Sequence, residues 1–477
     1  MPNYHITCPY CFWKFTDDQV LFRSETYFDE GTLLQQYGNE SELELNDEKE
    51  KLSDLRAAKR FLLKEDKSYQ SFWQKYGGTS EPPEKNLPFP QWQLPVIGRG
   101  DGISKLVEDA DHFVIAGVDA YQKTTNRRIC PECHNPLPLG YGKHKTKMIS
   151  IIGVTSAGKT VYISQLLRGM EDYAAKAGLV AFFASPNERL FVKDHPVIRN
   201  VRLPESTPAK SFSQPMFYDI VQRNGTGVTQ DTIVLYDIAG ENCYKPEDMV
   251  NYSKFVQHSD GLILLIDPKQ LHFIPGEMDT DESKPSTVLN TLHGVLTTKA
   301  GEKSKIPVAV CVSKSDLCSD ILPPLASEDV SQAGVDEFGL ATKQFNGREY
   351  NTLSQELVQL ININDPTFAL TMSTNYQNYN YFSVAAIGCS CGPNEKGVQV
   401  PLDEPNPRRI EEPILWLFKH FGYIGTNEKV RRPVRIKQPD CEVYEKVGLF
   451  RKEWVKHDGG YSEFEEDPVL ETIERQQ

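Results

Sequence analysis

Strand-length apolar runs alternate with helical patterns through the middle of the chain. Six such runs lie at 149–152, 179–183, 232–237, 261–266, 307–312 and 381–388. The helical patterns lie near 161–177, 287–296, 351–360 and 413–421. Runs that are apolar at nearly every position, such as 261–266, are typical of strands buried on both faces of a parallel sheet. The alternation predicts an α/β domain of three layers with a mostly parallel sheet of six strands.

The pattern changes on both sides of this region. Residues 40–60 are charge-rich with leucines at helical spacing, 77–95 are proline-rich, and 113–118 have the pattern of a strand. We predict three regions: 1–147 with a helical and proline-rich insertion at 30–120, an α/β domain at 148–425, and a C-terminal extension at 426–477.

Composition narrows the classes of function. The chain has 477 residues and a net charge of −14, which argues against nucleic-acid binding because that normally needs a basic face. No stretch approaches the roughly 20 apolar residues that span a bilayer, and the first residues lack the apolar segment of a secretory signal. We therefore expect a cytoplasmic protein without membrane contact. Its ten cysteines are then expected to be free thiols or metal ligands.

Residues 148–161, MISIIGVTSAGKTV, have the strand–loop–helix setting in which G-x-x-x-x-G-K-[ST] indicates a phosphate loop. Gly153 and Gly158 let successive backbone N–H groups point at one anion. Lys159 can reach the β- and γ-phosphates, and the Thr160 hydroxyl can bind Mg²⁺ at the helix N-terminus. The predicted phosphate-binding residues are Gly153, Thr155, Ser156, Ala157, Gly158, Lys159, Thr160 and Val161.

A second motif, TIVLYDIAG, follows the run at 232–237. Asp237 would lie at the carboxyl edge of the sheet beside the phosphate loop, where a carboxylate can hold Mg²⁺ through water. The backbone N–H of Gly240 could meet a γ-phosphate. A threonine in the irregular stretch before this strand would complete a switch segment; Thr207 is the candidate, and Thr226 and Thr229 are the alternatives. The predicted magnesium ligands are thus Thr160, Asp237 and Thr207.

A third motif, Ser313-Lys314-Ser315-Asp316, follows the run at 307–312. The Asp316 carboxylate can accept hydrogen bonds from guanine N1–H and N2–H₂, a donor pair that adenine lacks. The stem of Lys314 can lie over the base. These residues predict a preference for GTP and GDP.

Two C-P-x-C pairs offer metal ligands in the N-terminal region. Cys8 with Cys11 and Cys130 with Cys133 would each place two thiolates on a tight turn, as zinc knuckles do. Residues 12–129 separate the pairs, far more than the usual spacing of about 15–20 residues, but loop-closure entropy rises slowly with length. A shared Zn²⁺ is the leading interpretation. Separate reduced pairs and redox chemistry are the alternatives. His134, next to the second pair, is expected at the surface.

Together, GVTSAGKT, DIAG, SKSD and VAAIG resemble the GTPase class of P-loop proteins in order and in strand placement. The third motif begins with Ser313 where Asn or Thr is usual. The fourth has Ala385 where Ser is typical, so only the Ala386 N–H can contact the base. Glu241 stands where many Ras-like proteins have a water-orienting glutamine, which leaves the hydrolytic residue open. The catalytic candidates are Lys159, Thr160, Thr207, Gly240 and Glu241.

Zinc knuckles before such a domain resemble a narrower group, the second type of the bacterial double-GTPase family. This Ras-like branch is found in GTPase-centred conflict or defence systems, and the resemblance covers about 150–420. It implies a P-loop GTPase fold with a small zinc ribbon, and a nucleotide switch that works with a paired GTPase and effector proteins.

Four classes of function therefore stay open, the last of them a zinc-ribbon nucleic-acid protein, which the net charge of −14 disfavours. The leading one is a GTP-binding, slowly hydrolysing, Mg²⁺-dependent switch. The second is an assembly module that binds GTP with little hydrolysis and uses the zinc ribbon for docking. The third, an ATPase or small-molecule kinase, would require Asp316 to be accidental.

Overall fold

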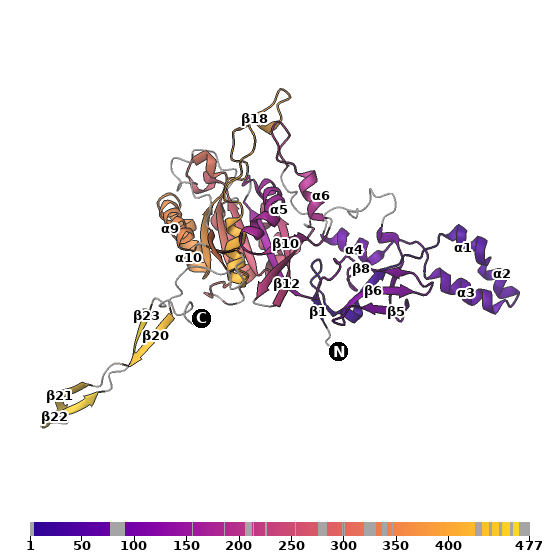
Figure 1. Ribbon diagram of the computed structural model, residues 1–477, viewed down its shortest axis with the longest axis horizontal. Helices are drawn as coiled ribbons and strands as arrows, with labels where there is room; N and C mark the ends of the chain where they lie inside the picture. The colour runs from indigo at the N-terminus through magenta and orange to yellow at the C-terminus, as the bar shows by residue number, and fades with distance from the viewer. Residues whose placement is uncertain are drawn as a thin grey trace. The chain divides into compact units, whose positions relative to one another are not determined.

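The computed structural model describes most of the chain, and its elements are drawn in Figure 1. The described residues are 4–76, 91–154, 156–185, 187–205, 212, 214–224, 227–252, 254–274, 284–297, 299, 301–318, 331–335, 341–345, 347–424, 432–437, 441–447, 451–457 and 461–466. The chain forms a larger unit, 1–345 with 349–425, and a smaller one, 346–348 with 426–477.

A seven-stranded sheet forms the centre of the larger unit, in the order β10-β11-β12-β9-β13-β14-β17. Five neighbouring strands, from β12 to β17, are parallel, while β11 runs antiparallel to both β10 and β12. The mixed α/β fold predicted from the sequence is confirmed. The strands are β9 (Lys145–Gly153), β10 (Val180–Phe183), β11 (Met216–Asn224), β12 (Gly227–Ile238), β13 (Gly261–Ile266), β14 (Val308–Val312) and β17 (Tyr379–Ser383).

The prediction of six strands is wrong by one, because β11 lies in a stretch that has no regular apolar pattern. This strand pairs with β12 along its whole length, from Met216↔Leu235 to Asn224↔Gly227. Asp219 interrupts its apolar pattern, and the Thr232 hydroxyl opposite donates to that carboxylate at 2.7 Å. A cross-strand polar pair thus hides a strand that the hydrophobic pattern alone does not reveal.

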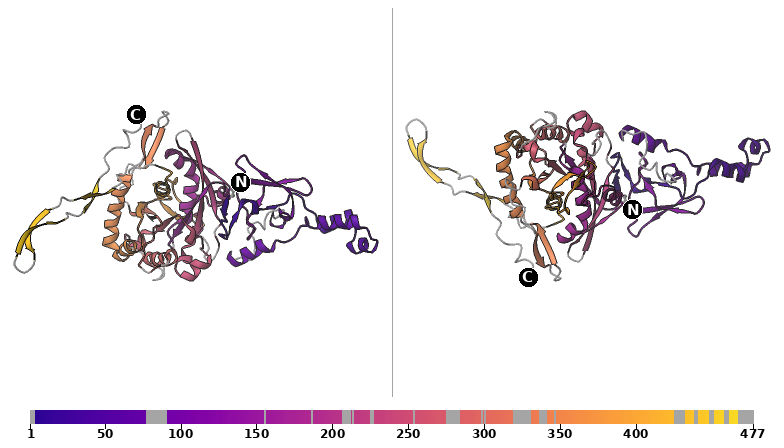
Figure 2. Two further views of the ribbon diagram at one scale, coloured as in Figure 1. Left: turned by 90° about the horizontal axis from the view of Figure 1, so that it is seen from below. Right: turned by 90° about the horizontal axis from the view of Figure 1, so that it is seen from above.

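Helices cover both faces of this sheet (Figure 2). On β13, Ile263 packs in the core that contains residues of α5 and α11, whereas the next residue, Leu264, packs in the core that contains residues of α8, α9 and α10. This alternation follows from the period of two along a strand. The helices of the domain are α5 (Lys159–Lys176), α6 (Asn187–Asp194), α7 (Pro246–Tyr252), α8 (Pro285–Leu296), α9 (Gly347–Asn364), α10 (Pro366–Asn375) and α11 (Glu412–Phe421).

The N-terminal region contains more strand than its sequence predicts. A six-stranded sheet in the order β7-β6-β5-β4-β3-β8 accompanies the two-stranded sheet β1-β2. Most of these strands are only two to four residues long, so they lack a long apolar run. The strands are β1 (His5–Thr7), β2 (Lys14–Thr16), β3 (Leu21–Arg23), β4 (Val96–Arg99), β5 (Gly102–Glu108), β6 (Val114–Asp119), β7 (Thr124–Thr125) and β8 (Arg128–Ile129).

Four helices lie in the insertion that the charge-rich pattern predicts. They are α1 (Glu30–Tyr37), α2 (Glu40–Leu45), α3 (Lys49–Lys59) and α4 (Lys67–Tyr76). The first three share a small core of Leu33, Leu43, Leu55 and Ala58. Residues 77–90 of the proline-rich stretch lie outside the described residues.

Short strand pairs complete the fold. In the larger unit they are β15 (Ser331–Val335) with β16 (Ala341–Phe345), and β18 (Cys391–Pro393) with β19 (Gln399–Pro401). In the smaller unit they are β20 (Arg432–Lys437) with β23 (Tyr461–Glu466), and β21 (Cys441–Val447) with β22 (Arg451–His457). None of the helices in the described ranges has the length and apolar character needed to cross a bilayer.

Candidate nucleotide-binding site

The loop between β9 and α5 has the backbone that an anion cradle requires. Gly158 has a φ of 73° and Ser156 a φ of 65°, both in the left-handed region. A Cβ on Gly153 would lie 2.7 Å from the Lys159 Cβ, so a larger residue would displace the lysine stem. The loop surrounds a cavity of about 310 Å³ lined by Gly153, Val154, Ser156, Ala157, Gly158, Lys159, Thr160, Val161, Pro204, Glu205, Ala239, Gly240 and Glu241.

Lys159 and Asp237 form a direct, buried ion pair beside this cavity. Burial lowers the pKa of the Lys159 ammonium to about 7. A charge in such a place needs an anionic partner, and the carboxylate supplies it. Thr160 is buried next to Lys159 in the chain, so a hydroxyl and a carboxylate, ligand types that Mg²⁺ accepts, both lie at this end of the sheet.

The segment predicted to read the base is tied to the phosphate loop. Lys314 donates to the Ser156 carbonyl oxygen at 2.6 Å, and its ammonium lies 2.7 Å from a carboxylate oxygen of Asp267. The other oxygen of Asp267 accepts from the Lys269 N–H and so caps the 3₁₀ turn Pro268–Leu271. Burial raises the pKa of Asp316, which lies in the next turn, Ser315–Cys318.

Sequence reasoning missed Asp267, although the signal was present. Like Asp237, it directly follows an apolar strand of the central sheet. Carboxyl ends of parallel strands meet at one edge, so both residues belong to the edge where ligands bind in open α/β sheets.

The remaining predicted residues are placed as follows. The Ser313 hydroxyl donates to the Ile266 carbonyl oxygen at 3.0 Å, and the Ala386 carbonyl accepts from Gln165 at 3.2 Å. Gly240 and Glu241 line the cavity. Thr155 and Thr207 lie outside the described residues. The roles of all these residues stay predictions.

The four cysteines of the two C-P-x-C pairs come together in the N-terminal region. Their sulfur atoms all lie within 4.8 Å of one another, and the Cys8–Cys133 and Cys11–Cys130 distances are both 3.7 Å. A tetrahedron with Zn–S bonds of about 2.3 Å has S···S edges of about 3.8 Å, so the four thiolates fit Zn²⁺. Backbone N–H groups of Tyr10 and Glu132 point at Cys8 and Cys130 from 3.4 Å, as they would toward thiolates.

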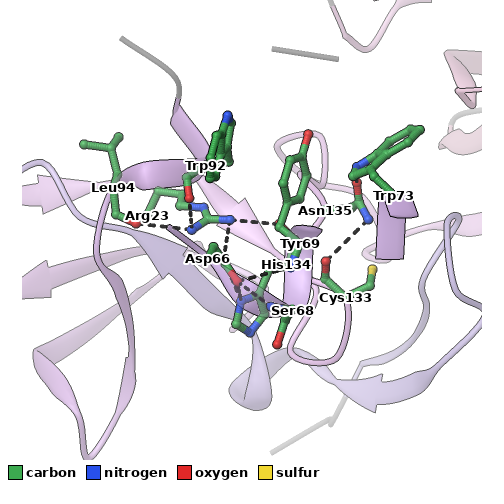
Figure 3. A network of polar contacts seen from close by, with 10 residues as sticks. All are labelled: Arg23, Asp66, Ser68, Tyr69, Trp73, Trp92, Leu94, Cys133, His134 and Asn135. Atoms are coloured by element: carbon green, nitrogen blue, oxygen red, sulfur yellow. Dashed lines mark hydrogen bonds and ion pairs between the residues drawn. The ribbon is translucent and has the colours of Figure 1, made fainter. Parts of the chain in front are cut away.

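A polar network fixes the second pair to helix α4 (Figure 3). The Asp66 carboxylate lies 2.7 Å from the Arg23 guanidinium and 2.8 Å from Nδ1 of His134. Trp73 on α4 donates to Asn135 at 3.0 Å, and Asn135 donates to the Cys133 carbonyl oxygen at 3.4 Å. The expectation of a surface His134 is therefore wrong, because its ring is largely buried against this carboxylate.

The cysteine cluster also contacts the α/β domain. The Tyr236 hydroxyl on β12 donates to the Pro9 carbonyl oxygen at 2.7 Å, inside the first knuckle. Phe12 stacks on His258 with ring centroids 4.4 Å apart. The residue directly before Asp237 is therefore hydrogen-bonded to the first cysteine knuckle.

The sequence of this site's domain is similar to a known protein family. Residues 147–363 match the sequence model of Double-GTPase 2. This part of the chain is similar to the Double-GTPase 2 family. The match confirms the family resemblance drawn from the motifs, and it supports GTP binding by this segment.

Individual relatives are more distant. The chain is 22% identical over 325 residues to the "Putative ESX-1 scaffolding and assembly protein SaeC" of Mycolicibacterium smegmatis, a match that covers 62% of this chain and 80% of that protein. Among solved structures, the Ski7 GTPase-like domain of S. cerevisiae bound to GTP is 12% identical with a TM-score of 0.24, covering 64% of this chain and 56% of that one. Sup35 complexed with GDP is 12% identical with a TM-score of 0.22, covering 51% and 38%. This chain therefore spans about half or less of those two chains.

Proposed function

We propose that this protein is a GTP-binding switch that hydrolyses GTP slowly, with Mg²⁺, and that works with partner proteins. The observation that carries the proposal is the link from phosphate loop to base segment: Lys314 bonds to Ser156, two residues before Gly158, and lies two residues before Asp316. One ligand could thus meet phosphate donors at one end and a guanine acceptor at the other.

Each group has a defined task in this proposal. Lys159 would leave Asp237 and bind the β- and γ-phosphates, and the freed carboxylate with Thr160 would hold the ion. Mg²⁺ supplies neutralisation of the charge on the transferred phosphoryl oxygens. Gly240 and Glu241, which line the cavity, would contact the γ-phosphate end. No arginine finger is assigned within the chain, so slow intrinsic turnover is expected.

The test of base preference is competition by ATP and xanthosine triphosphate against labelled GTP, for wild type and Asp316→Ala. The variant should lose its guanine preference and retain phosphate binding, since only the carboxylate that accepts from the base is removed. Asp172→Ala, an exposed aspartate on α5, is the matched control. Equal competition by ATP in the wild type would overturn the guanine assignment.

A second function is favoured by two observations. Glu241 lines the cavity where Ras-like proteins have a glutamine, and the SaeC relative carries the name of a scaffolding and assembly protein. The chain would then bind GTP without meaningful hydrolysis and use the cysteine-cluster region to dock a partner. Single-turnover hydrolysis that Lys159→Ala abolishes, combined with nucleotide-independent partner binding, would count against this function. Action with a paired GTPase in bacterial defence is the role that the family resemblance proposes.

A further inference from the structure

A hairpin lies between the predicted base loop and α11. It consists of β18 and β19, and main-chain hydrogen bonds close its root. The Ala385 N–H donates to the Arg408 carbonyl at 3.1 Å, and the Arg408 N–H returns to the Ala385 carbonyl at 2.9 Å. The Ala385–Arg408 pair thus closes the root of the hairpin, next to Ala386. We call residues 388–407 the base hairpin.

The root of the base hairpin is tightly packed. Gly388 has a φ of 65°, and a Cβ there would lie 1.8 Å from the carbonyl oxygen of Asn406. Asn406 in turn donates its N–H to the Ile387 carbonyl at 2.8 Å. The backbones at Gly388 and Asn406 therefore lie too close for any side chain at position 388, so only glycine allows this packing of the root.

The far strand of the base hairpin holds the chain that leads to the phosphate cavity. The Asn200 N–H donates to the Pro401 carbonyl at 2.9 Å, and the Leu203 N–H donates to the Gln399 carbonyl at 3.1 Å. Pro204 and Glu205, the next residues, line the cavity around the phosphate loop. One hairpin thus adjoins the base loop and bonds to the residues that directly precede the wall of the phosphate cavity.

Helix α5, which starts at Lys159, donates hydrogen bonds to the base loop, to the segment after the hairpin and to the segment before Asn200. Gln165 donates to the Ala386 carbonyl at 3.2 Å, and Tyr162 donates to the Ile410 carbonyl at 3.1 Å. Ser164 donates to the His195 carbonyl at 2.6 Å, just before the segment that reaches Asn200. Hydrogen bonds therefore link α5 to the base loop and to the segment before Asn200, and the hairpin links the base loop to residues 200–203.

We propose that the base hairpin positions the nucleotide site: it holds residues 200–203 so that Pro204 and Glu205 form a wall of the cavity, and it couples that wall to the base loop. The proposal rests on the proposed function, since it assigns the hairpin to a guanine-nucleotide site. Its loss should accelerate nucleotide release while leaving the central sheet intact.

The first variant shortens the hairpin without touching its root. Residues 391–401 are replaced by Asn-Gly between Ser390 and Leu402, which already pair through a Leu402 N–H bond of 2.9 Å to the Ser390 carbonyl. Asn-Gly favours the two-residue turn that such a pair needs. We expect GDP carrying a fluorescent label to dissociate about tenfold faster, because two hydrogen bonds to residues 200–203 are lost.

The second variant uses a matched pair of glycines. Gly397 in the hairpin turn and Gly301 in a distant turn have φ values of 75° and 76°, and a Cβ at either meets nothing within 4 Å. Gly397→Ala and Gly301→Ala should therefore strain the backbone equally. Only Gly397→Ala should speed GDP release and the hydrogen exchange of the Leu203 amide.

The outcomes separate the two proposals. Absence of guanine-nucleotide binding by the wild type contradicts the proposed function. If the wild type binds but all three variants release GDP at its rate, the positioning proposal is wrong. If Gly301→Ala accelerates release as much as Gly397→Ala, the effect is general destabilisation, and the proposal is wrong as well. Should the shortened protein fail to fold, the glycine pair still decides.

Discussion

The phosphate loop and the cysteine cluster are both compact sites, but they are assembled in opposite ways. The loop is contiguous, and its shape follows from two glycines and the helix that starts at Lys159. The cluster joins Cys8 to Cys133 across 125 positions of the chain, through an intervening sheet and four helices. The residues of the loop are adjacent in the chain, whereas those of the cluster meet only when distant parts of the N-terminal region come together.

The surroundings of the two sites differ in the same way. The Asp237 carboxylate already balances the charge of Lys159 within the protein, so the buried lysine needs no ligand as its partner. Within the described part of the chain, the thiols of the cluster bond to one another and to backbone N–H groups. Burial raises the pKa of Cys8 and Cys133, whereas hydrogen bonds with neighbouring thiols lower the pKa of Cys130, and a bound cation would favour all four thiolates together. The cluster should therefore depend on its metal for stability, and the loop should not depend on its nucleotide.

The largest effect is expected from Cys8→Ser. Loss of one thiolate should remove Zn²⁺ and unfold the N-terminal region, because metal affinity at structural sites of zinc-finger peptides is worth about 10–16 kcal/mol. Zinc content by mass spectrometry and the thermal midpoint measure the result. Cys391→Ser, at an exposed thiol, is the control and should change neither. Stoichiometric zinc in Cys8→Ser would show that the cluster is not the metal site.

The next effect is expected from Lys159→Met, which removes an ammonium shared between protein and ligand. GTP affinity should fall by about 100-fold or more, because charge-assisted phosphate contacts disappear. Stability without nucleotide should also fall, by about 3–5 kcal/mol, since Asp237 stays buried without the ammonium. Urea unfolding and nucleotide titration measure the two losses.

The double variant Lys159→Met/Asp237→Asn separates these losses. An amide needs no counter-charge, so the double variant should recover most of the stability but none of the GTP affinity. Recovery of both would mean that Lys159 acts only as the partner of Asp237 and not as a phosphate ligand.

The contrast between the two sites also explains which features the sequence predicts. Apolar runs such as 261–266 identify strands because burial on both faces leaves no polar position, and the loop motif is read directly because its residues are adjacent. β11 was missed because Asp219 is satisfied by a threonine on another strand. The contacts of His134 and Asp267 were missed for the same reason: their partners, Asp66 and Lys314, are distant in sequence.

A smaller effect is expected from Asp267→Asn. The amide oxygen can still cap the turn at Lys269, but the charge that orients Lys314 is lost. Because Lys314 is partly exposed, GTP affinity should fall only about three- to tenfold. Asp365→Asn, which changes an equivalent cap at Phe368 on α10, is the control for loss of a capping charge. Equal affinity in both variants would show that Asp267 has no part in nucleotide binding.

The smallest effect concerns pH and the base-reading carboxylate. Burial raises the pKa of Asp316, with the charges of Arg408 and Lys314 opposing the shift. Only the ionised carboxylate accepts both guanine donors, so the preference for GTP over ATP should be constant near neutral pH. It should decline as the pH falls through the raised pKa, above the ordinary aspartate value of about 3.9.

The same shift means that protonation stabilises the nucleotide-free fold as the pH falls. Affinity ratios measured from about pH 7 to about pH 4.5 test this, with Asp316→Asn expected to give a flat profile. If the wild-type ratio were equally flat, guanine selection would not depend on the charge of Asp316.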